Sequence, residues 1–498
     1  MHFFLKIIQL LIFNHSLLIG FKLRAVAKII GFALSIPTLP RYNNTRLLHF
    51  HSKACNMKTL ICNATILTMN KTMDVIEQGY MVIENDRIIA LGTGDYPETC
   101  EHILNANGKI LMPGMINAHT HIGMIPFRSL GDDCKDRLRR YLFPLEIECM
   151  TEALTYTSSK YAIAELLLSG VTTFVDMYYF EDRVAQATDE MGARALLGET
   201  IIDFATCDAD KPYGGLDYCE WFIPKWRDHP RITPFPAPHA TNTNNEDALK
   251  RANALSEQYQ VPLSLHVAEM DYEINYFKEK YNQTPVEFLD SLGLVNEHLI
   301  AAHCIFMTDN DITLFAKNRA TVAHCIGANT KSAKGVAPVK QMLEQGVAVG
   351  LGTDGPSSGN TLDIITQFKL FADFHKTANK DRSIFPAHEI VRLGTIEAAK
   401  AIKMEHSIGS LEIGKKADFV LIETDSANMF PIFDPYSALV YSANASNVDT
   451  VYVDGQCLVK NKTLQHASLS ELRQQLDQQM TKFKAKAQER SQMLDVSK

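Results

Sequence analysis

The stretch "PGMINAHTH", residues 113–121, places His119 and His121 one residue apart at the end of an apolar run. If this run is a β-strand, both imidazoles can reach one ion, because side chains two residues apart point to the same face of a strand. Gly123 then allows the next loop to turn away closely. Two histidines in a short turn indicate little by themselves, so the interpretation depends on the rest of the chain.

Seven more apolar or β-branched runs follow, separated by segments with the length and pattern of amphipathic helices. This alternation over residues 113–405 predicts βα units and a parallel sheet. Eight strands with their helices predict an α/β fold, the TIM (β/α)8 barrel. The seven runs are "GVTTFVDMY", "ARALLGETII", "ITPFPAPHA", "VPLSLHVAE", "HLIAAHC", "ATVAHC" and "VAVGLGTDG".

Polar residues end six of the eight runs. In a parallel barrel the C-terminal ends of all strands open on one face, so residues far apart in the sequence meet there. We therefore expect one site at this face. The residues that end the runs are His119, His121, His239, His266, His303, His324 and Asp354.

Two regions of short strands flank the barrel. Residues 57–112 and 406–465 both contain strand-like runs closed by Gly, Asn or Asp, so we predict that the two chain ends pair into one small β-sandwich. Residues 466–498 predict one amphipathic docking helix, because apolar residues recur there at steps of three to four. These apolar residues are Leu469, Leu472, Leu476, Met480 and Phe483.

The first 56 residues differ from the rest, with seven Lys or Arg and no Asp or Glu. They lack the run of about 20 apolar residues that a transmembrane helix needs. Three interpretations compete: an acid-poor targeting peptide, a weak membrane anchor, and an upstream extension ahead of a start at Met57. The strand-like pattern that begins at Met57 favours the last.

Composition narrows the class of protein. The 498 residues are 46% hydrophobic and 21% charged, which is typical of a globular chain. A net charge of −8 offers no basic surface for nucleic acid, so a small-molecule partner is expected. The ten cysteines include no C-x-x-C pair and indicate reduced thiols in a cytoplasmic protein with no stable membrane partner.

The polar strand ends contain a plausible metal site. His119, His121, His266 and Asp354 supply three imidazoles and a carboxylate, and a catalytic metal needs a few such ligands with one position open for water. The run "RITPFPAPHA" has no lysine that could be carboxylated to bridge two metals. We therefore predict one divalent ion. Nitrogen and oxygen ligands fit Zn²⁺, with Fe²⁺ and Mn²⁺ as alternatives.

The motifs "PGMINAHTH", "LHVAE", "AAHC", "GLGTDG" and "SIGSLEIGKKADFVLI" follow one another between residues 57 and 463. In these motifs the chain resembles the amidohydrolase superfamily. The resemblance is to its mononuclear aminohydrolases, which include S-adenosylhomocysteine and methylthioadenosine deaminases and triazine chlorohydrolases. It implies a metal-bound water that attacks an aromatic or amidine-like carbon and expels ammonia. Such relatives are often homo-oligomers.

The resemblance also implies catalytic roles. Asp354 would take the proton of the metal-bound water, whose pKa falls to roughly 7. Glu269, in "HVAE", would carry protons to the ring nitrogen and then to the departing amine. His303 would orient the water or stabilise charge on the adduct. Each has a structural alternative: Glu269 could be a surface residue that opens a helix, and His303 a core histidine.

Substrate residues follow from the same resemblance. Glu146 matches a ribose-binding position, Arg194 an arginine of the pocket and His239 a pocket histidine, while His324 and Asn329 match a loop that shapes the site. The chain departs from adenosine-type relatives before "PLE", where it has arginines in place of the usual tryptophans. These arginines would suit a charged heterocycle, or could form a solvated helix face. They are Arg137, Arg139 and Arg140.

The leading hypothesis is thus hydrolytic deamination of a heterocycle such as S-adenosylhomocysteine, methylthioadenosine or adenosine. On the same metal site, the alternatives are guanine or another heterocycle deaminase, a chlorohydrolase and an imidazolonepropionase-like cyclic amide hydrolase. A non-catalytic scaffold would have lost ligands, and all four are present together with Glu269. A membrane-bound binding protein would be anchored by residues 1–56.

Overall fold

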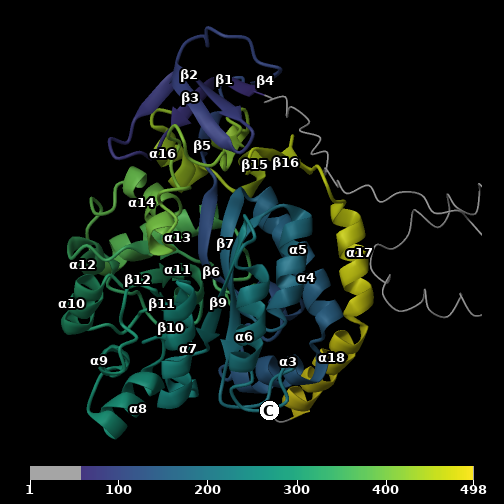
Figure 1. The fold of residues 1–498 in the computed structure, drawn as a ribbon, viewed down its shortest axis with the longest axis vertical. Helices are drawn as coiled ribbons and strands as arrows, with labels where there is room; N and C mark the ends of the chain where they lie inside the picture. Colours follow the sequence, from purple (N-terminus) through teal and green to yellow (C-terminus); the bar gives the residue numbers. More distant parts are fainter. Residues whose placement is uncertain (1–57, 497–498) are drawn as a thin grey trace, which may run out of the picture. The chain divides into compact units, whose positions relative to one another are not determined.

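All eight predicted runs of the middle region are parallel strands (Figure 1). The computed structural model describes residues 58–496, so the predictions for residues 1–56 and for a start at Met57 lie outside the described residues. The strands are buried along their length, which is why they appear in the sequence as continuous apolar runs. They are β6 (Met115–Thr120), β7 (Val171–Tyr178), β8 (Arg194–Ile201), β9 (Ile232–Pro238), β10 (Leu263–Val267), β11 (Leu299–His303), β12 (Thr321–His324) and β13 (Val349–Leu351).

The eight strands form two four-stranded parallel sheets, in the orders β6-β7-β8-β9 and β10-β11-β12-β13. A parallel bridge between Ala240 and His266 links the end of β9 to β10. On the other side, the amide of Asp354 donates to the carbonyl of His119 at 3.1 Å, which links the end of β13 to β6. The two sheets therefore meet along both of their outer strands.

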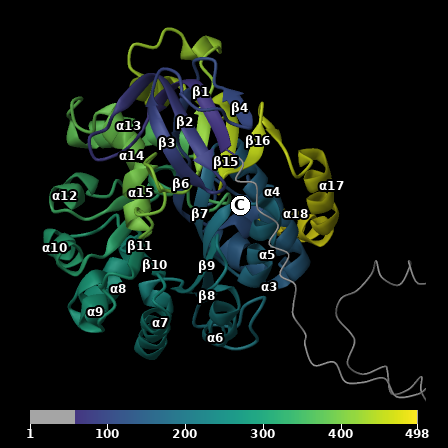
Figure 2. The ribbon, with the colours of Figure 1, turned by 45° about the horizontal axis from the view of Figure 1, so that its top comes forward.

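Helices connect successive strands and lie outside them (Figures 1 and 2). Several begin with a side chain that caps the first turn. Thr151 accepts a hydrogen bond from the amide of Leu154, and Asn245 from that of Ala248. The helices between β6 and β14 are α3 (Phe143–Cys149), α4 (Glu152–Leu168), α5 (Glu181–Met191), α6 (Gly215–Trp226), α7 (Glu246–Tyr259), α8 (Asp271–Tyr281), α9 (Pro285–Ser291), α10 (Asp309–Asn318), α11 (Ile326–Lys331), α12 (Val339–Glu344), α13 (Ile364–Asn379), α14 (Ala387–Leu393) and α15 (Ile396–Ala401).

The two chain ends pair, as predicted, but their strands form one nine-stranded sheet in the order β17-β16-β15-β14-β5-β1-β2-β3, with β4 beside β1. The junction is the antiparallel pair of β5 and β14, where Leu111 faces Leu421. The strands are β1 (Lys58–Leu67), β2 (Val75–Glu84), β3 (Arg87–Thr93), β4 (His102–Asn105), β5 (Ile110–Pro113), β14 (Phe419–Ile422), β15 (Val448–Val453), β16 (Gln456–Lys460) and β17 (Thr463–Leu464).

The C-terminal segment contains two helices, so the prediction of a single helix was wrong. α17 (Leu469–Gln479) packs on α4, and α18 (Thr481–Val496) packs on α3. The chain leaves the first helix at Met480 and Phe483 then reaches Phe127, with ring centroids 4.7 Å apart. Docking on two different helices explains the break, which the regular apolar spacing does not reveal.

No helix of residues 58–496 is both long and apolar enough to cross a membrane. The nine cysteines of this region form no disulfide with one another.

Candidate metal centre and active site

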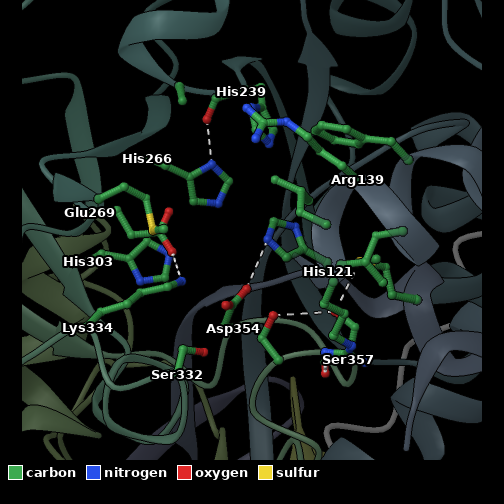
Figure 3. A pocket seen from close by; sticks show the side chains of 18 of the residues that line it. His121, Arg139, His239, His266, Glu269, His303, Ser332, Lys334, Asp354 and Ser357 are labelled. Atoms are coloured by element: carbon green, nitrogen blue, oxygen red, sulfur yellow. Dashed lines mark hydrogen bonds and ion pairs between the residues drawn. The ribbon is translucent and has the colours of Figure 1, made fainter. Parts of the chain in front are cut away.

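The four predicted metal ligands meet at the C-terminal ends of the strands. Figure 3 shows three of them, His121, His266 and Asp354. One ring nitrogen from each of His119, His121 and His266 lies within 4.8 Å of the other two. Asp354 Oδ1 lies 3.1 Å from His121 Nε2 and 3.9 Å from His119 Nε2. Three imidazoles and a carboxylate therefore surround one point.

Hydrogen bonds behind the ligands fix two of the imidazoles. His121 Nδ1 donates to the carbonyl of Met177 and His266 Nδ1 to that of His239, each at 2.5 Å, because a carbonyl can only accept. Burial would lower the pKa of His121, but its hydrogen bond to Asp354 raises it to about 9 in the absence of an ion. In the neutral form of each ring, Nε2 keeps a lone pair for a metal, an arrangement common among metal-binding histidines.

His119 differs from both, because neither of its ring nitrogens has a hydrogen-bond partner among the described residues. Burial, together with the neighbouring His121 and His266, holds its pKa well below the ordinary value, so this imidazole is neutral. A buried imidazole without partners is costly unless a ligand completes it. The donor set therefore fits a divalent ion.

Asp354 is held as an anion in an unusual backbone conformation. Its φ is 58°, and the amide of Gly355 donates to its Oδ1 at 2.7 Å. Burial by itself would raise the pKa of Asp354, but the hydrogen bond and charge of His121 hold it well below the usual range. Positive φ is uncommon outside glycine and occurs preferentially at functional sites.

Glu269 lies beside this group, between β10 and α8. Its Oε1 is 3.6 Å from His303 Nε2 and forms an ion pair with Lys334 Nζ (Figure 3). Burial would raise the pKa of Glu269, yet the charges of His303 and Lys334 lower it to about 2. His303 Nδ1 in turn donates to Asn329 Oδ1 at 2.8 Å, so its Nε2 faces Glu269. A carboxylate and an imidazole thus stand together beside the candidate metal centre.

A cavity of about 590 Å³ opens above this group. Two of the predicted substrate residues line it: Glu146, on α3, and His239, after β9. Burial raises the pKa of Glu146 to about 7 and lowers that of His239 to about 4. The ring of His239 lies 5.0 Å from that of His266, which places it next to the candidate metal ligands.

The other three predicted substrate residues do not line the cavity. Arg194 begins β8, at the end of the strand opposite the cavity, where it donates to Asp418 at 2.9 Å and to Asp454 at 2.7 Å. His324 pairs with His375 at 2.9 Å in the core. Asn329 is one layer behind the cavity, where it holds His303.

The arginines before "PLE" separate into different roles. Arg137 lines the cavity, but its guanidinium donates to the carbonyls of Leu130 and Phe127 at 2.7 and 3.1 Å and to that of Ser357, so it joins its own loop to the segment after β13. Arg139 also lines the cavity and forms no ion pair with any residue in the described part of the chain. Arg140 does not reach the cavity wall.

Sequence reasoning missed Lys334, which pairs with Glu269, and Met177, whose carbonyl anchors His121. Every residue has a main-chain carbonyl, so the role of the Met177 carbonyl cannot be inferred from residue type. Lys334 lies in a loop between α11 and α12, where no periodic pattern indicates the direction of a side chain. A search for cations in the loops that follow the strands could have found it.

Comparison with known proteins agrees with this geometry. The model of the amidohydrolase family matches residues 110–458. The chain is 38% identical to the 5-methylthioadenosine/S-adenosylhomocysteine deaminase 1 of Syntrophus aciditrophicus, over 84% of this chain and 96% of that protein. It is 35% identical to the 5'-deoxyadenosine deaminase of Methanobrevibacter smithii, over 78% of this chain and 89% of that protein.

A solved structure is similar as well. The adenosine deaminase of Xanthomonas campestris with bound zinc superposes with a TM-score of 0.83 at 29% identity, covering 86% of this chain and 99% of that chain.

Proposed function

The chain belongs to the amidohydrolase family, and we propose that it is a metal-dependent aminohydrolase that releases ammonia from an adenosine-like nucleoside. One observation carries the proposal. Three imidazoles and the Asp354 carboxylate surround a point beside Glu269 and His303, at the floor of a cavity large enough for a small molecule.

His119, His121, His266 and Asp354 would hold one divalent ion, with Zn²⁺ the first choice and Fe²⁺ or Mn²⁺ the alternatives. When bound there, the ion would lower the pKa of water to about 7 and so make a nucleophile available at neutral pH. The hydrogen bonds of the ligands favour metal binding. His121 and His266 are each anchored through Nδ1 and turn Nε2 toward the candidate centre, and Asp354 is an anion.

Glu269 would move the protons. Asp354 would take a proton from the attacking water, and Glu269, as a carboxylate, would carry it to the ring nitrogen and then carry the hydroxyl proton of the adduct to the amino group. The amino group leaves as ammonia, and the ring carbon keeps the oxygen of water as a carbonyl. The low pKa of Glu269 fits the accepting step, and the adjacent His303 can donate a hydrogen bond to charge that develops on the adduct.

Glu146 and His239 would position the nucleoside. Glu146 is a buried carboxyl in the cavity wall and can accept hydrogen bonds from ribose hydroxyls, while His239 stands near the metal ligands on the side where a ring would lie. The two sequence relatives named above are deaminases of 5-methylthioadenosine and S-adenosylhomocysteine and of 5'-deoxyadenosine, so 5'-methylthioadenosine and S-adenosylhomocysteine are the proposed substrates.

We also infer that the two parallel sheets are the halves of the expected TIM barrel, since they meet along both outer strands. A cytoplasmic location is inferred from the cysteine pattern of the sequence.

Ammonia release tests the proposal. The full chain loaded with Zn²⁺ is offered 5'-methylthioadenosine, S-adenosylhomocysteine, adenosine, guanine, cytosine and an aminotriazine. Release from the adenosines that stops with a chelator and in Glu269→Gln supports it. Release from guanine or the aminotriazine alone would show that the substrate is not an adenosine. Metal-bound protein that releases no ammonia from any compound would contradict the proposed deaminase activity.

A further inference from the structure

A second group of possible metal ligands overlaps the first. Cys325 follows β12, and its Sγ lies within 4.8 Å of a ring nitrogen of His119 and of one of His303, which also lie within that distance of each other. All three side chains are buried, and neither Cys325 nor His119 lines the cavity. This group contains a thiol, whereas the group described above has only nitrogen and oxygen donors.

The backbone leaves room for this thiol. A Cβ added to Gly352 would come within 3.0 Å of Cys325 Sγ and of the backbone of His119, so the glycine lets the three chain segments approach closely. The thiol forms a weak hydrogen bond to the carbonyl of Ala323 at 3.9 Å and lies against the backbone of Asp354. Cys325 is therefore packed against the candidate metal centre without a strong interaction of its own.

His119 is the ligand that both groups share, and it is the one imidazole of the three that no hydrogen bond anchors. His121 and His266 are each fixed by a carbonyl, but both ring nitrogens of His119 are buried and unpartnered within residues 58–496. Its ring can therefore serve an ion in either group.

We propose that Cys325, His303 and His119 form a second metal site that takes a thiophilic ion, such as Cd²⁺, in place of the ion held by the nitrogen and oxygen ligands. Soft ions prefer thiolate over carboxylate donors. On binding, the Cys325 thiol releases its proton to solvent and the thiolate coordinates the ion, with no change of oxidation state.

This site would make the protein sensitive to soft metals. An ion held there takes His119 away from His121, His266 and Asp354, and it takes His303 away from Glu269. Inactivation by a soft ion would then arise inside the active site rather than at an exposed cysteine.

The test is the ultraviolet absorption of the full chain, freed of metal and given one equivalent of Cd²⁺. We expect a sulfur-to-cadmium charge-transfer band in the native protein and its loss in Cys325→Ser. Cys219→Ser is the matched control, because Cys219 is equally buried but lies on α6, and it should keep the band. His121→Ala should also keep the band, since His121 belongs only to the other group.

A band that persists in Cys325→Ser would overturn the proposal. X-ray absorption at the cadmium edge of the native protein gives a second reading that needs no variant: a cadmium–sulfur distance is expected, and nitrogen and oxygen neighbours alone would contradict the site. Neither reading depends on turnover, so the absence of deaminase activity would leave this inference standing, and its failure would leave the proposed function standing.

Discussion

The two ends of the parallel strands each bury a cluster of charged residues, and the clusters differ in how completely their polar groups are paired. At the N-terminal end of β8, Arg194 donates to Asp418 and Asp454, and Lys416 lies 3.0 Å from Asp454. At the C-terminal ends, His119 has no partner within the described residues. A fully paired cluster needs no ligand, whereas unpaired buried nitrogens are free to bind one.

The two clusters of buried charge have different surroundings. The Arg194 cluster joins the parallel strands to the terminal sheet, because Asp418 lies next to β14 and Asp454 lies between β15 and β16. The cluster around Asp354 faces a cavity. We therefore expect mutations in the first to change stability and mutations in the second to change catalysis.

The largest effect is expected for Asp354→Asn. The amide lacks the charge that binds the ion and pairs with His121, so metal content and ammonia release should fall together to background. Metal analysis and a turnover assay on the same preparation check this. A variant that keeps one ion and full activity would remove Asp354 from the metal centre.

Glu269→Gln should lose turnover by about 10²–10⁴-fold, the usual contribution of a general acid–base group. Its metal content should stay at that of the native chain, because Glu269 is not among the ligands. Loss of the ion from this variant would contradict the separation of proton transfer from metal binding.

Arg194→Met should reduce the free energy of unfolding by about 3–5 kcal/mol, because it leaves buried carboxylates without their cation. The KM of the protein that remains folded should not change, since Arg194 lies away from the cavity. Urea denaturation and steady-state kinetics measure the two quantities. A raised KM with an unchanged free energy of unfolding would mean that Arg194 acts on the substrate and does not stabilise the fold.

Above pH 7, where Glu146 with its pKa of about 7 is a carboxylate, Glu146→Ala should raise KM for nucleosides by roughly 10- to 100-fold, the effect of losing hydrogen bonds of about 1.5–3 kcal/mol to a charged group. The free base adenine, which lacks ribose, serves as the comparison substrate. An equal loss for both would mean that Glu146 does not bind the sugar.

The smallest effect is expected for Lys334→Met, and it concerns pH. His303 and Lys334 lower the pKa of Glu269 to about 2, so removing the lysine should raise that pKa. The carboxylate form of Glu269 would then be lost at a higher pH as the solution is acidified. The acidic limb of the kcat/KM profile should therefore move to higher pH. A profile that stays in place would show that Lys334 does not tune Glu269.

The sequence predicts the parallel strands and places the candidate ligands at one end of them. Strands buried on both faces appear as apolar runs, and the polar residue that ends each run lies where parallel strands open. The residue pattern therefore brings His119, His121, His266 and Asp354 to one end of the strands, but it also places there His324, which pairs with His375 in the core. The pairing of the two chain ends is also predictable, because both ends contain short strand-like runs closed by Gly, Asn or Asp.

Other features depend on direction in space, which residue type does not encode. Arg194 stands at the start of its run, and in a parallel sheet that position faces away from the cavity, so its place in the run already argues against a substrate role. The break at Met480 interrupts neither the apolar spacing nor the helical composition. Lys334 reaches Glu269 from a loop, so only the folded chain shows the pair.

The most direct test of the account is metal-dependent turnover of one preparation of the full chain. Ammonia release from 5'-methylthioadenosine is measured with the metal present, after its removal by a chelator and after addition of one equivalent of Zn²⁺. We expect activity with the metal present, its loss after chelation and its return with Zn²⁺, with one ion bound per chain. Ammonia release that is unaffected when the bound metal has been removed would contradict the assignment of the unpaired imidazoles to a metal centre.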